Sequence, residues 1–365
     1  MGLISIKVKS ILKGTKIGTF LRKYKWNKAI VSRDGAQRAI SKYRGVLSQE
    51  DNEKLIADII DMAKKYRFSP EEYFYYHFMD KDENERKTFI SDLNRIDFCE
   101  KLNKAKNLTI FNDKMKSAEV FKSYYGRDIC GVKSKNDISK FLSFVEKHNR
   151  FILKPIALSC GKGIEIFDFS NVDNKEQKFY ELYEKHCSGQ KDGFIVEELV
   201  IQVPEMSQFH DSSLNTIRVA TVKFDEGAEV IASFFRTGRG GSIVDNAGAG
   251  GVFGTIDIKT GTIIAVGDEY GNSYEKHPDT NIEMVGFTIP RWEEAVAMAK
   301  ELATVVDGNR YSGWDLALTD NGWIMIEGNA RGQFVWQIPT QKGFLDEANA
   351  ILRRLGMPEM KKLGI

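Results

Sequence analysis

Residues 313–331 read GWDLALTDNGWIMIEGNAR, and their pattern predicts a β-hairpin. Two apolar runs, Trp314–Thr319 and Trp323–Ile326, have the alternation and aromatic content typical of strands. The residues Asp320-Asn321-Gly322 separate the two runs, and an Asn-Gly pair in that position favours a tight hairpin turn. The segment is therefore expected to form two antiparallel strands near the end of the 365-residue chain.

Polar side chains mark both arms of this hairpin. Asp315 lies on the first arm, Glu327 ends the second, and Asn329 and Arg331 follow directly. Two carboxylates and an amide oxygen form an all-oxygen set of the kind that Mg²⁺ prefers. Arg331 adds a cation that suits a phosphate or an acyl oxyanion beside the metal. A surface hairpin with scattered charges is the alternative, but four such groups around one turn favour a metal–nucleotide site, with Asp315, Glu327 and Asn329 as metal ligands.

The same residues resemble the metal-binding end of the ATP-grasp superfamily. D-alanine ligases carry a similar Asp…Glu-x-Asn arrangement, and biotin carboxylase and the carbamoyl-phosphate synthetases carry Glu-x-Asn-x-Arg. Over residues 70–345 the chain most resembles the sugar-transfer-associated branch, relatives of the α-L-glutamate ligases. D-alanine ligases have an arginine two residues before the first metal aspartate, where this chain has Gly313. The resemblance therefore implies that Arg331 or Arg218 is the catalytic residue that stabilises the oxyanion.

The composition indicates a soluble globular protein. Apolar residues make up 42% and charged residues 28% of a chain long enough for two or three subdomains. No apolar run approaches the roughly 18 residues that span a bilayer, and no secretory signal is visible. The four cysteines form no CxxC pair, which argues against a zinc site or a disulfide framework. A cytoplasmic location is the expectation that follows.

Residues 1–45 are strongly basic, although the whole chain has a net charge of only +2. They hold eight lysines and four arginines against one acid, Asp34, with apolar residues interleaved. Such a segment suits an anionic membrane surface, such as the inner face of a membrane, or an acidic partner. A solvated basic helix that packs its apolar side on the domain is the alternative. Peripheral membrane contact is therefore one expectation. A pI of 8.1 and the absence of a recognised motif argue against a nucleic-acid partner.

Helices are predicted over residues 1–105. Apolar residues recur at helical spacing over residues 51–66. Ser69 and Pro70 have the capping and first-turn preferences that begin another helix. The aromatic residues within 73–78 have a spacing more typical of a buried core than of a surface for stacking nucleic-acid bases.

From about residue 107 short helices and strands alternate, and after residue 215 strands dominate. The expected class is α+β with antiparallel sheets. The resemblance implies the ATP-grasp fold, in which two α+β lobes clasp ATP, with ATP and Mg²⁺ as cofactors. The expected domains are a mainly helical N-terminal domain (1–105), a small lobe with a phosphate flap (106–200) and a large lobe with the metal site (201–365). The expected strands are residues 151–155, 164–167, 194–200, 216–223, 230–237 and 255–258, and a helix is expected at 292–305.

A lysine inside an apolar strand marks a second part of the site. Lys154 lies in Phe151–Pro155, where its ammonium must either reach solvent or meet an anion. A glycine-containing loop follows, and glycines let backbone N–H groups turn toward a phosphate. It is not a Walker A motif, because no Ser or Thr follows the Gly-Lys pair. The resemblance implies that Lys154 contacts the α-phosphate and that a flap closes over the β- and γ-phosphates, through Ser159, Gly161, Lys162 and Gly163.

Lys114 follows Asp113 at an expected helix start. ATP-grasp ligases often carry a lysine after an aspartate at this point, so the resemblance implies that Lys114 reaches the nucleotide phosphates. Lys116 and Lys122 are nearby alternatives, and a surface charge is the other explanation.

The strand at residues 194–200 matches the hinge strand of the superfamily, which pairs with adenine through its backbone. The resemblance implies that Glu197 accepts a hydrogen bond from the adenine amino group and that Glu198 and Leu199 form the hinge. Glu205 then falls where a ribose-binding acid is often found.

Two further clusters are expected to bind the second substrate. One is Asn215–Arg218, which follows His210, and the other begins at Arg236 and ends with the glycine-rich stretch. Arginines suit the two-pronged capture of a carboxylate or a phosphate. The glycine-rich stretch at 246–251 either allows close approach of a ligand to the backbone or forms a mobile loop. His210 is the best candidate for a general base, with a structural histidine as the alternative. The predicted substrate-binding residues are His210, Asn215, Arg236, Arg239 and Asn246.

The resemblance implies ATP-dependent ligation of a carboxylate and an amine. The carboxylate attacks the γ-phosphate, and the amine then attacks the acyl-phosphate to give an amide, ADP and phosphate. The family association suggests small-molecule substrates, namely an amino acid and a cell-surface glycan or sugar-acid precursor. A phosphotransferase acting on a hydroxyl and a non-catalytic ATP-binding module of a glycan-assembly complex are the alternatives.

Overall fold

The computed structural model describes residues 26, 28–156, 161, 163–188, 192–243, 245 and 250–360. The chain divides into two compact units, which are described separately. One contains Met1–Asp97 and Gln341–Ile365, and the other contains Phe98–Thr340. Three predicted site residues, Ser159, Lys162 and Asn246, lie outside the described residues, as does most of the basic N-terminal segment.

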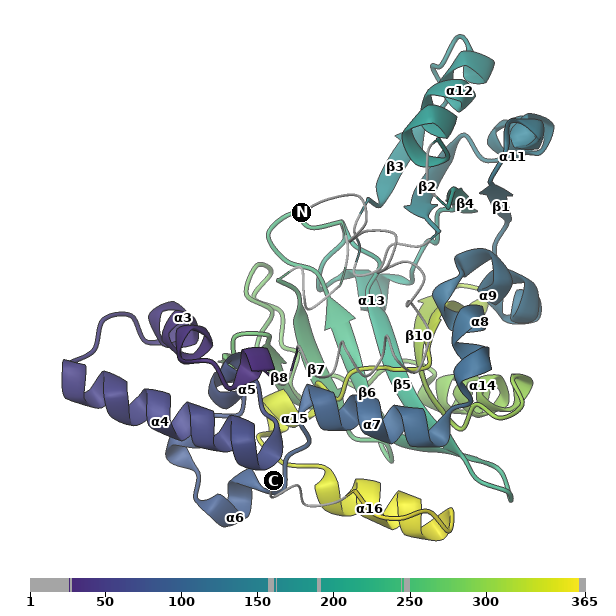
Figure 1. Cartoon of the computed structure of the whole chain (residues 1–365). Helices are drawn as coiled ribbons and strands as arrows, with labels where there is room; N and C mark the ends of the chain where they lie inside the picture. The colour runs from purple at the N-terminus through teal and green to yellow at the C-terminus, as the bar shows by residue number, and fades with distance from the viewer. Residues whose placement is uncertain are drawn as a thin grey trace, which may run out of the picture. The chain divides into compact units, whose positions relative to one another are not determined.

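The first unit is helical, as the sequence predicts (Figure 1). Ser69 and Glu72 form a reciprocal capping box at the start of α5, with Pro70 at its first position, which explains why a helix begins there. The helices are α3 (Arg33–Tyr43), α4 (Gln49–Tyr66), α5 (Pro70–Tyr75), α6 (Glu83–Arg86), the start of α7 (Asp92–Leu102) and α16 (Leu345–Arg354), with a 3₁₀ turn η1 (Phe78–Asp80).

Aromatic side chains form much of the core of this unit. Tyr73, Phe74, Tyr76 and Phe78 are each at most 7% exposed. Edge-to-face ring contacts join Phe78 to Phe68 and Tyr73, which adds directional packing to the burial of apolar area. The prediction that the aromatic run forms a core is confirmed.

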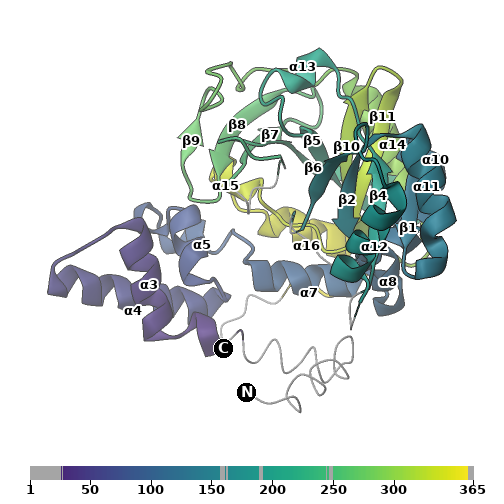
Figure 2. The same cartoon turned by 90° about the horizontal axis from the view of Figure 1, so that it is seen from above.

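The second unit contains two antiparallel sheets. The smaller sheet has the strand order β1-β4-β2-β3, and α11 and α12 supply apolar side chains to its core, among them Phe141 and Phe179. Figures 1 and 2 show both helices beside this sheet. The elements are β1 (Ile129–Val132), β2 (Arg150–Pro155), β3 (Glu165–Asp168), β4 (Phe194–Glu198), α11 (Ile138–Lys147), α12 (Lys175–His186) and η3 (Lys135–Asp137).

The larger sheet has seven strands in the order β11-β10-β5-β6-β7-β8-β9. One face packs on α14 through residues such as Ile217, Trp314 and Leu302, and the other face carries Arg218, Arg236 and Asp315. The strands are β5 (Thr216–Lys223), β6 (Ala228–Thr237), β7 (Val252–Ile256), β8 (Ile263–Asp268), β9 (Ser273–Tyr274), β10 (Tyr311–Thr319) and β11 (Gly322–Asn329). The helices of the unit outside the small sheet are η2 (Ala105–Asn107), α8 (Leu108–Asn112), α9 (Lys114–Val120), α10 (Lys122–Tyr125), α13 (Pro204–Ser207), α14 (Trp292–Val305) and α15 (Gln337–Thr340).

The α+β class with two antiparallel sheets is confirmed. The units divide the chain differently from the expected domains in two places. Helices α8–α10 lie in the expected small lobe, yet Phe111, Phe121 and Tyr125 pack in the core of the large sheet. Residues 341–365, expected in the large lobe, belong to the helical unit, where Gln341 donates to the Tyr75 carbonyl. Among the described residues, no helix has the length and apolar character needed to cross a bilayer. Peripheral membrane contact stays a prediction.

Candidate functional site

A cavity of ≈ 340 Å³ in the second unit brings together half of the predicted site residues. Its walls come from α9, the lysine strand β2, the hinge strand β4 and the strands β5, β6, β10 and β11. The predicted residues that line it are Lys114, Lys154, Gly161, Glu197, Arg218, Arg236, Asp315, Glu327, Asn329 and Arg331. Segments more than two hundred residues apart in the sequence therefore contribute to one site.

The hairpin aims its three oxygen-bearing side chains at this cavity through a β-bulge. Asp315 is paired with Glu327, whereas its neighbour Leu316 is paired with Met325, so Ile326 is the additional residue on β11. Asn329 is paired with Gly313. Paired residues of antiparallel strands point to the same face, so Glu327 and Asn329 lie on the face of Asp315.

Asp315 is held by two arginines. Arg218 Nε and Nη2 lie 2.5 and 2.6 Å from the two carboxylate oxygens of Asp315, and Arg236 Nη1 lies 2.6 Å from Oδ2. Burial would raise the pKa of Asp315, but the two guanidinium groups lower it, so the carboxylate is ionised. The proposed metal ligand is thus charged and fixed in place.

Asp245 and Thr216 extend this network. Arg236 Nη2 lies 2.9 Å from Asp245, and the Thr216 hydroxyl donates to the same carboxylate. Burial raises the pKa of Asp245 despite the attraction of Arg236. Burial would lower the pKa of Arg236, yet Asp245 and Asp315 raise it. Two arginines and two aspartates therefore balance their charges at one end of the cavity.

Glu327 and Asn329 fit a hard metal ion. Within the described part of the chain, no hydrogen bond or ion pair engages the Glu327 carboxylate, and Asn329 Nδ2 is buried without a hydrogen-bond partner. The two ends of an amide are assigned from their surroundings, so the same group turned over presents its oxygen. With Asp315 they form an oxygen-only donor set that suits Mg²⁺.

Two lysines that line the same cavity supply positive charge. Lys114 is the first residue of α9, whose N-cap Asp113 accepts from the backbone N–H groups of Met115 and Lys116 at 3.0 and 3.3 Å. Burial lowers the pKa of Lys114, although Glu327 acts in the opposite direction. Lys154 Nζ lies 2.8 Å from Glu197 Oε2.

A second cavity, of ≈ 440 Å³, adjoins the first. Lys154, Glu197 and Ile326 line both cavities, so they form the boundary between them. Apolar side chains, among them Ile152 and Ile166, face the residues that follow β4, including the predicted hinge residues Glu198 and Leu199.

Comparison with protein families gives a direct match. The family model "Sugar-transfer associated ATP-grasp" matches residues 93–353. The chain belongs to this family. The predictions of an ATP-grasp enzyme with ATP and Mg²⁺ as cofactors are thereby confirmed.

Solved structures similar to this ATP-grasp chain have low sequence identity. D-alanyl-alanine synthetase A from Vibrio cholerae is 10% identical, with a TM-score of 0.41 over 71% of this chain and 65% of its own. The ATP-grasp ligase PsnB, complexed with a minimal precursor, is 12% identical, with a TM-score of 0.41 over 69% and 64%. N5-carboxyaminoimidazole synthase from Aspergillus clavatus is 9% identical, with a TM-score of 0.41 over 70% and 54%. The chain thus spans less than two thirds of these proteins. No curated protein is significantly similar to it.

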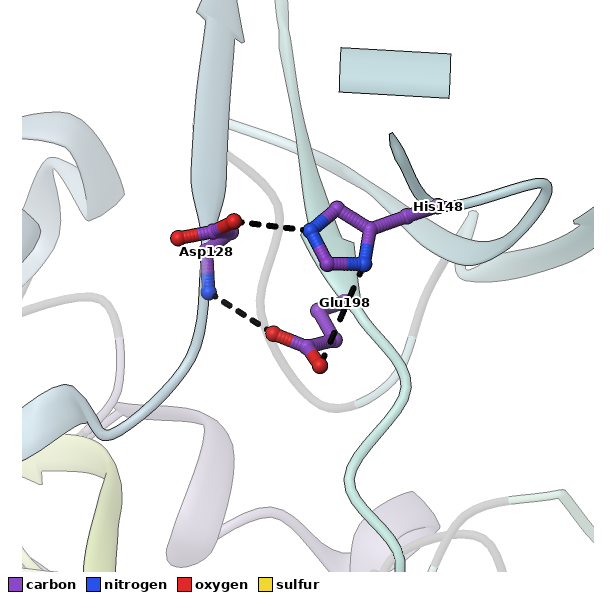
Figure 3. Close-up of side chains that lie close together, drawn as sticks. All are labelled: Asp128, His148 and Glu198. Carbon is purple, nitrogen blue, oxygen red and sulfur yellow. Dashed lines mark hydrogen bonds and ion pairs between the residues drawn. The ribbon is translucent and has the colours of Figure 1, made fainter. Parts of the chain in front are cut away.

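Glu198, a predicted hinge residue of this ATP-grasp chain, belongs to a small polar cluster (Figure 3). Its Oε2 accepts from the Asp128 backbone N–H at 3.1 Å, and its Oε1 lies 3.9 Å from His148 Nδ1. His148 Nε2 lies 2.8 Å from Asp128 Oδ2, which also pairs with Lys147. These three side chains are close enough to share a cation, but Lys147 already compensates Asp128. The cluster ties the hinge to the start of β1.

Glu197 has a different contact from the expected one. Its carboxylate accepts from Lys154 and Arg127 rather than being available only to a ligand. Burial would raise its pKa, but these two cations lower it to about 2. A hydrogen bond to an adenine amino group therefore competes with two ion pairs.

His210 and Asn215 line neither cavity. His210 Nδ1 lies 2.9 Å from Ser213 Oγ, and Asn215 Nδ2 donates to the carbonyls of Met206 and His210 at 2.8 and 2.9 Å. Both are buried. These contacts stabilise the segment before β5, and the contact of both residues with a substrate stays a prediction.

Arg239 and Glu205 also lie away from both cavities. Arg239 donates to Tyr274 Oη at 3.0 Å and lies 3.3 Å from Asp268 Oδ2. Glu205 is exposed in the short helix α13. Their predicted substrate and ribose contacts receive no support from these positions.

Sequence reasoning gave no role to Thr216, Asp245 or Arg127. Asp245 lies in the glycine-rich region beside Asn246, and Arg127 lies just before β1. Their partners are 29 and 70 residues away in the sequence, so no local pattern signals them.

Proposed function

We propose that this ATP-grasp chain is an ATP-dependent carboxylate–amine ligase that forms an amide and releases ADP and phosphate. The observation that carries the proposal is the single cavity lined both by Lys114 and Lys154 and by the oxygen set of Asp315, Glu327 and Asn329. Cations and hard oxygen ligands in one cavity suit a triphosphate with its metal ion.

The two adjoining cavities suggest how the nucleotide binds. The second cavity offers apolar side chains and the backbone after β4, which suit a planar purine, with Glu198 and Leu199 at the hinge. The triphosphate then passes Lys154 into the first cavity, toward Lys114 and Gly161. Gly163, exposed just beyond, continues the proposed flap.

Asp315, Glu327 and Asn329 would hold Mg²⁺, which neutralises charge on the β- and γ-phosphates when bound. Lys114 and Lys154 would offset charge on the transferring phosphoryl group. A carboxylate oxygen of the first substrate attacks the γ-phosphorus, and the bond to ADP breaks. The amine then attacks the acyl carbon, loses a proton, and phosphate leaves.

Arg331 and Arg218 are the proposed catalytic residues. Both line the cavity, where Arg331 Nη2 lies 2.8 Å from Glu100 and Arg218 is paired with Asp315. A guanidinium group near the acyl carbon would stabilise the oxyanion that forms during amine attack. Arg236, at the same end, is the remaining predicted substrate-binding residue that lines the cavity.

The proposed substrates are small molecules: an amino acid and a cell-surface glycan or sugar-acid precursor. The name of the matching family, sugar-transfer associated, supports this class. The balanced charges of Arg218, Arg236, Asp245 and Asp315 suit a substrate with both acidic and basic groups.

The test is release of ADP and phosphate from Mg·ATP with pooled carboxylates, with and without pooled amines. Phosphate release that needs both pools and is lost in Glu327→Gln would support the ligase, and Glu294→Gln, an exposed residue of α14, is the matched control. A phosphorylated product without free phosphate would instead indicate a phosphotransferase. ATP binding without turnover under every pool would favour a non-catalytic module.

A further inference from the structure

Arg127 joins the hinge strand to the metal-site hairpin. Its Nε and Nη2 both lie 2.8 Å from Glu197 Oε2 on β4. Nη1 donates to the carbonyl oxygens of Tyr125 and Met325 at 2.9 and 2.7 Å, and Nη2 lies 3.4 Å from that of Ile326. The Arg127 side chain is only 2% exposed, so these contacts are made away from solvent.

The β11 carbonyls that Arg127 reaches belong to the bulge before Glu327. Ile326 is the additional residue there, and a bulge leaves backbone groups without ladder partners. Buried carbonyl groups need donors, and the guanidinium supplies them. Arg127 thus contacts both the bulge that orients the proposed metal ligand and the carboxylate beside the lysine strand.

Glu197 is the point where two cations converge. Its side chain is 4% exposed, and the same oxygen, Oε2, lies 2.8 Å from Lys154 Nζ. The negative charge of Glu197 also acts to raise the pKa values of Lys114 and Tyr125. The Arg127 guanidinium is charged under all ordinary conditions.

We propose that Arg127 is a positioning residue that keeps Glu197 ionised, so that Lys154 can leave Glu197 for a nucleotide phosphate without proton uptake. The inference rests on the proposed nucleotide site. Lys154 pairs with Glu197 in this structure, yet it also lines the cavity where the phosphates would bind.

Lys154 and Arg127 together compensate the charge on Glu197 in this structure. When Lys154 turns to a phosphate, the buried carboxylate loses one of its two cationic partners. Arg127 keeps its two contacts, because its other nitrogen contacts with the Tyr125 and Met325 carbonyls hold the guanidinium in place. Without Arg127 the carboxylate would be buried and unpaired, a state that a protein relieves by protonating the group.

Calorimetric titration with Mg·ADP tests this role. The number of protons taken up is obtained from two buffers of different ionisation enthalpy at the same neutral pH. Arg127→Met is expected to take up about one more proton per bound ADP than wild type. Its affinity for ADP should therefore fall as the pH rises, by up to about tenfold per pH unit more than that of wild type. The double variant Arg127→Met/Glu197→Gln should lose this additional uptake, and Arg127→Lys should match wild type.

The control is Arg95→Met, which removes a buried arginine paired with Asp92 in the helical unit. It should leave ADP affinity and proton uptake unchanged. A folded Arg127→Met that binds ADP with the wild-type proton count would overturn the role of Arg127 while leaving the nucleotide site intact. Failure of the wild type to bind ADP would overturn the nucleotide site itself, and the role with it.

Infrared difference spectroscopy of the wild type provides a measure that does not depend on the folding of Arg127→Met. Glu197 should remain ionised when ADP binds, so no protonated-carboxyl band should appear. A band that appears on binding and is missing in Glu197→Gln would contradict the proposal.

Discussion

Asp315 and Arg218 face each other across β10 and β5 and form a two-pronged ion pair, with contacts of 2.5 and 2.6 Å. Arg236 adds a third contact to the same carboxylate, whose side chain is 4% exposed. Removing one partner of a buried ion pair leaves an uncompensated charge and costs about 3–5 kcal/mol. Asp315 is therefore expected to stabilise the fold as well as to serve the proposed metal site.

Replacement of Asp315 should affect stability and turnover together. Asp315→Asn is expected to lower the free energy of unfolding by about 3 kcal/mol, because Arg218 and Arg236 are left buried beside a neutral amide. Urea denaturation and phosphate release measure the two effects. Asp225→Asn is the control, since Asp225 is 89% exposed and pairs with Arg310 at the surface. Unchanged stability of Asp315→Asn would contradict the importance of the ion pair.

Replacement of Glu327 should reduce turnover without reducing stability. Within the described residues its carboxylate has no hydrogen bond or ion pair, so Glu327→Gln should change the unfolding free energy by no more than about 0.5 kcal/mol. Loss of a metal ligand should nevertheless reduce ATP turnover by about 100-fold or more and raise the Mg²⁺ concentration needed. Turnover measured across a Mg²⁺ series, beside thermal melting, tests both points. A large loss of stability would show that Glu327 has a structural partner.

Glu197 should make the protein sensitive to acid. Its pKa is lowered from 4.5 to about 2 by Arg127 and Lys154 against the effect of burial. A depressed pKa contributes stability that is fully present above the unfolded value and is lost as the pH falls from 4.5 to about 2. The loss should be about 3 kcal/mol. Urea denaturation at a series of pH values should give Glu197→Gln a shallower decline than wild type in this interval, and equal slopes would refute the prediction.

Gly126 should not tolerate a side chain. It has φ +57°, and an added Cβ would lie 2.3 Å from Ile324 Cγ2 on β11. Gly126→Ala is expected to cost about 2–4 kcal/mol, from left-handed strain and from overpacking. Gly45→Ala supplies the control, because Gly45 has φ +75° but open space around it and should cost only about 1 kcal/mol. Thermal melting of both variants gives the comparison, and equal shifts would argue against the clash.

Local patterns predicted a large part of the fold. The helix at residues 292–305 and the strand at 216–223 have the bounds that their apolar periods predict, because one face of each lies in the same core. The strand expected at 194–200 ends at Glu198, where the chain leaves the sheet for the hinge. Strands β1, β8 and β9 were not predicted, because much of their stability comes from pairing with neighbours in the sheet.

The candidate site was predictable where its residues are close in sequence. Asp315, Glu327 and Asn329 share one hairpin, so their spacing alone indicated a common site. The partners of Asp315 lie 97 and 79 residues upstream, and only sheet pairing brings them together. The hydrogen bonds of His210 and Asn215 could not be predicted in this way, because polar residue types give no indication of whether the protein itself satisfies them.

The bulge at Ile326 also determines how the sequence of this hairpin should be aligned with the hairpins of related proteins. In a regular ladder Asp315 would pair with Ile326, and Glu327 would point to the opposite face of the sheet. Deleting Ile326 would restore a regular ladder with Glu327 still opposite Asp315, whereas deleting one turn residue would shift the whole arm. When a related sequence has one residue fewer between the two carboxylates, the alignment gap should therefore be placed at Ile326 and not at the turn. Loop grafts onto this scaffold should keep the turn length fixed.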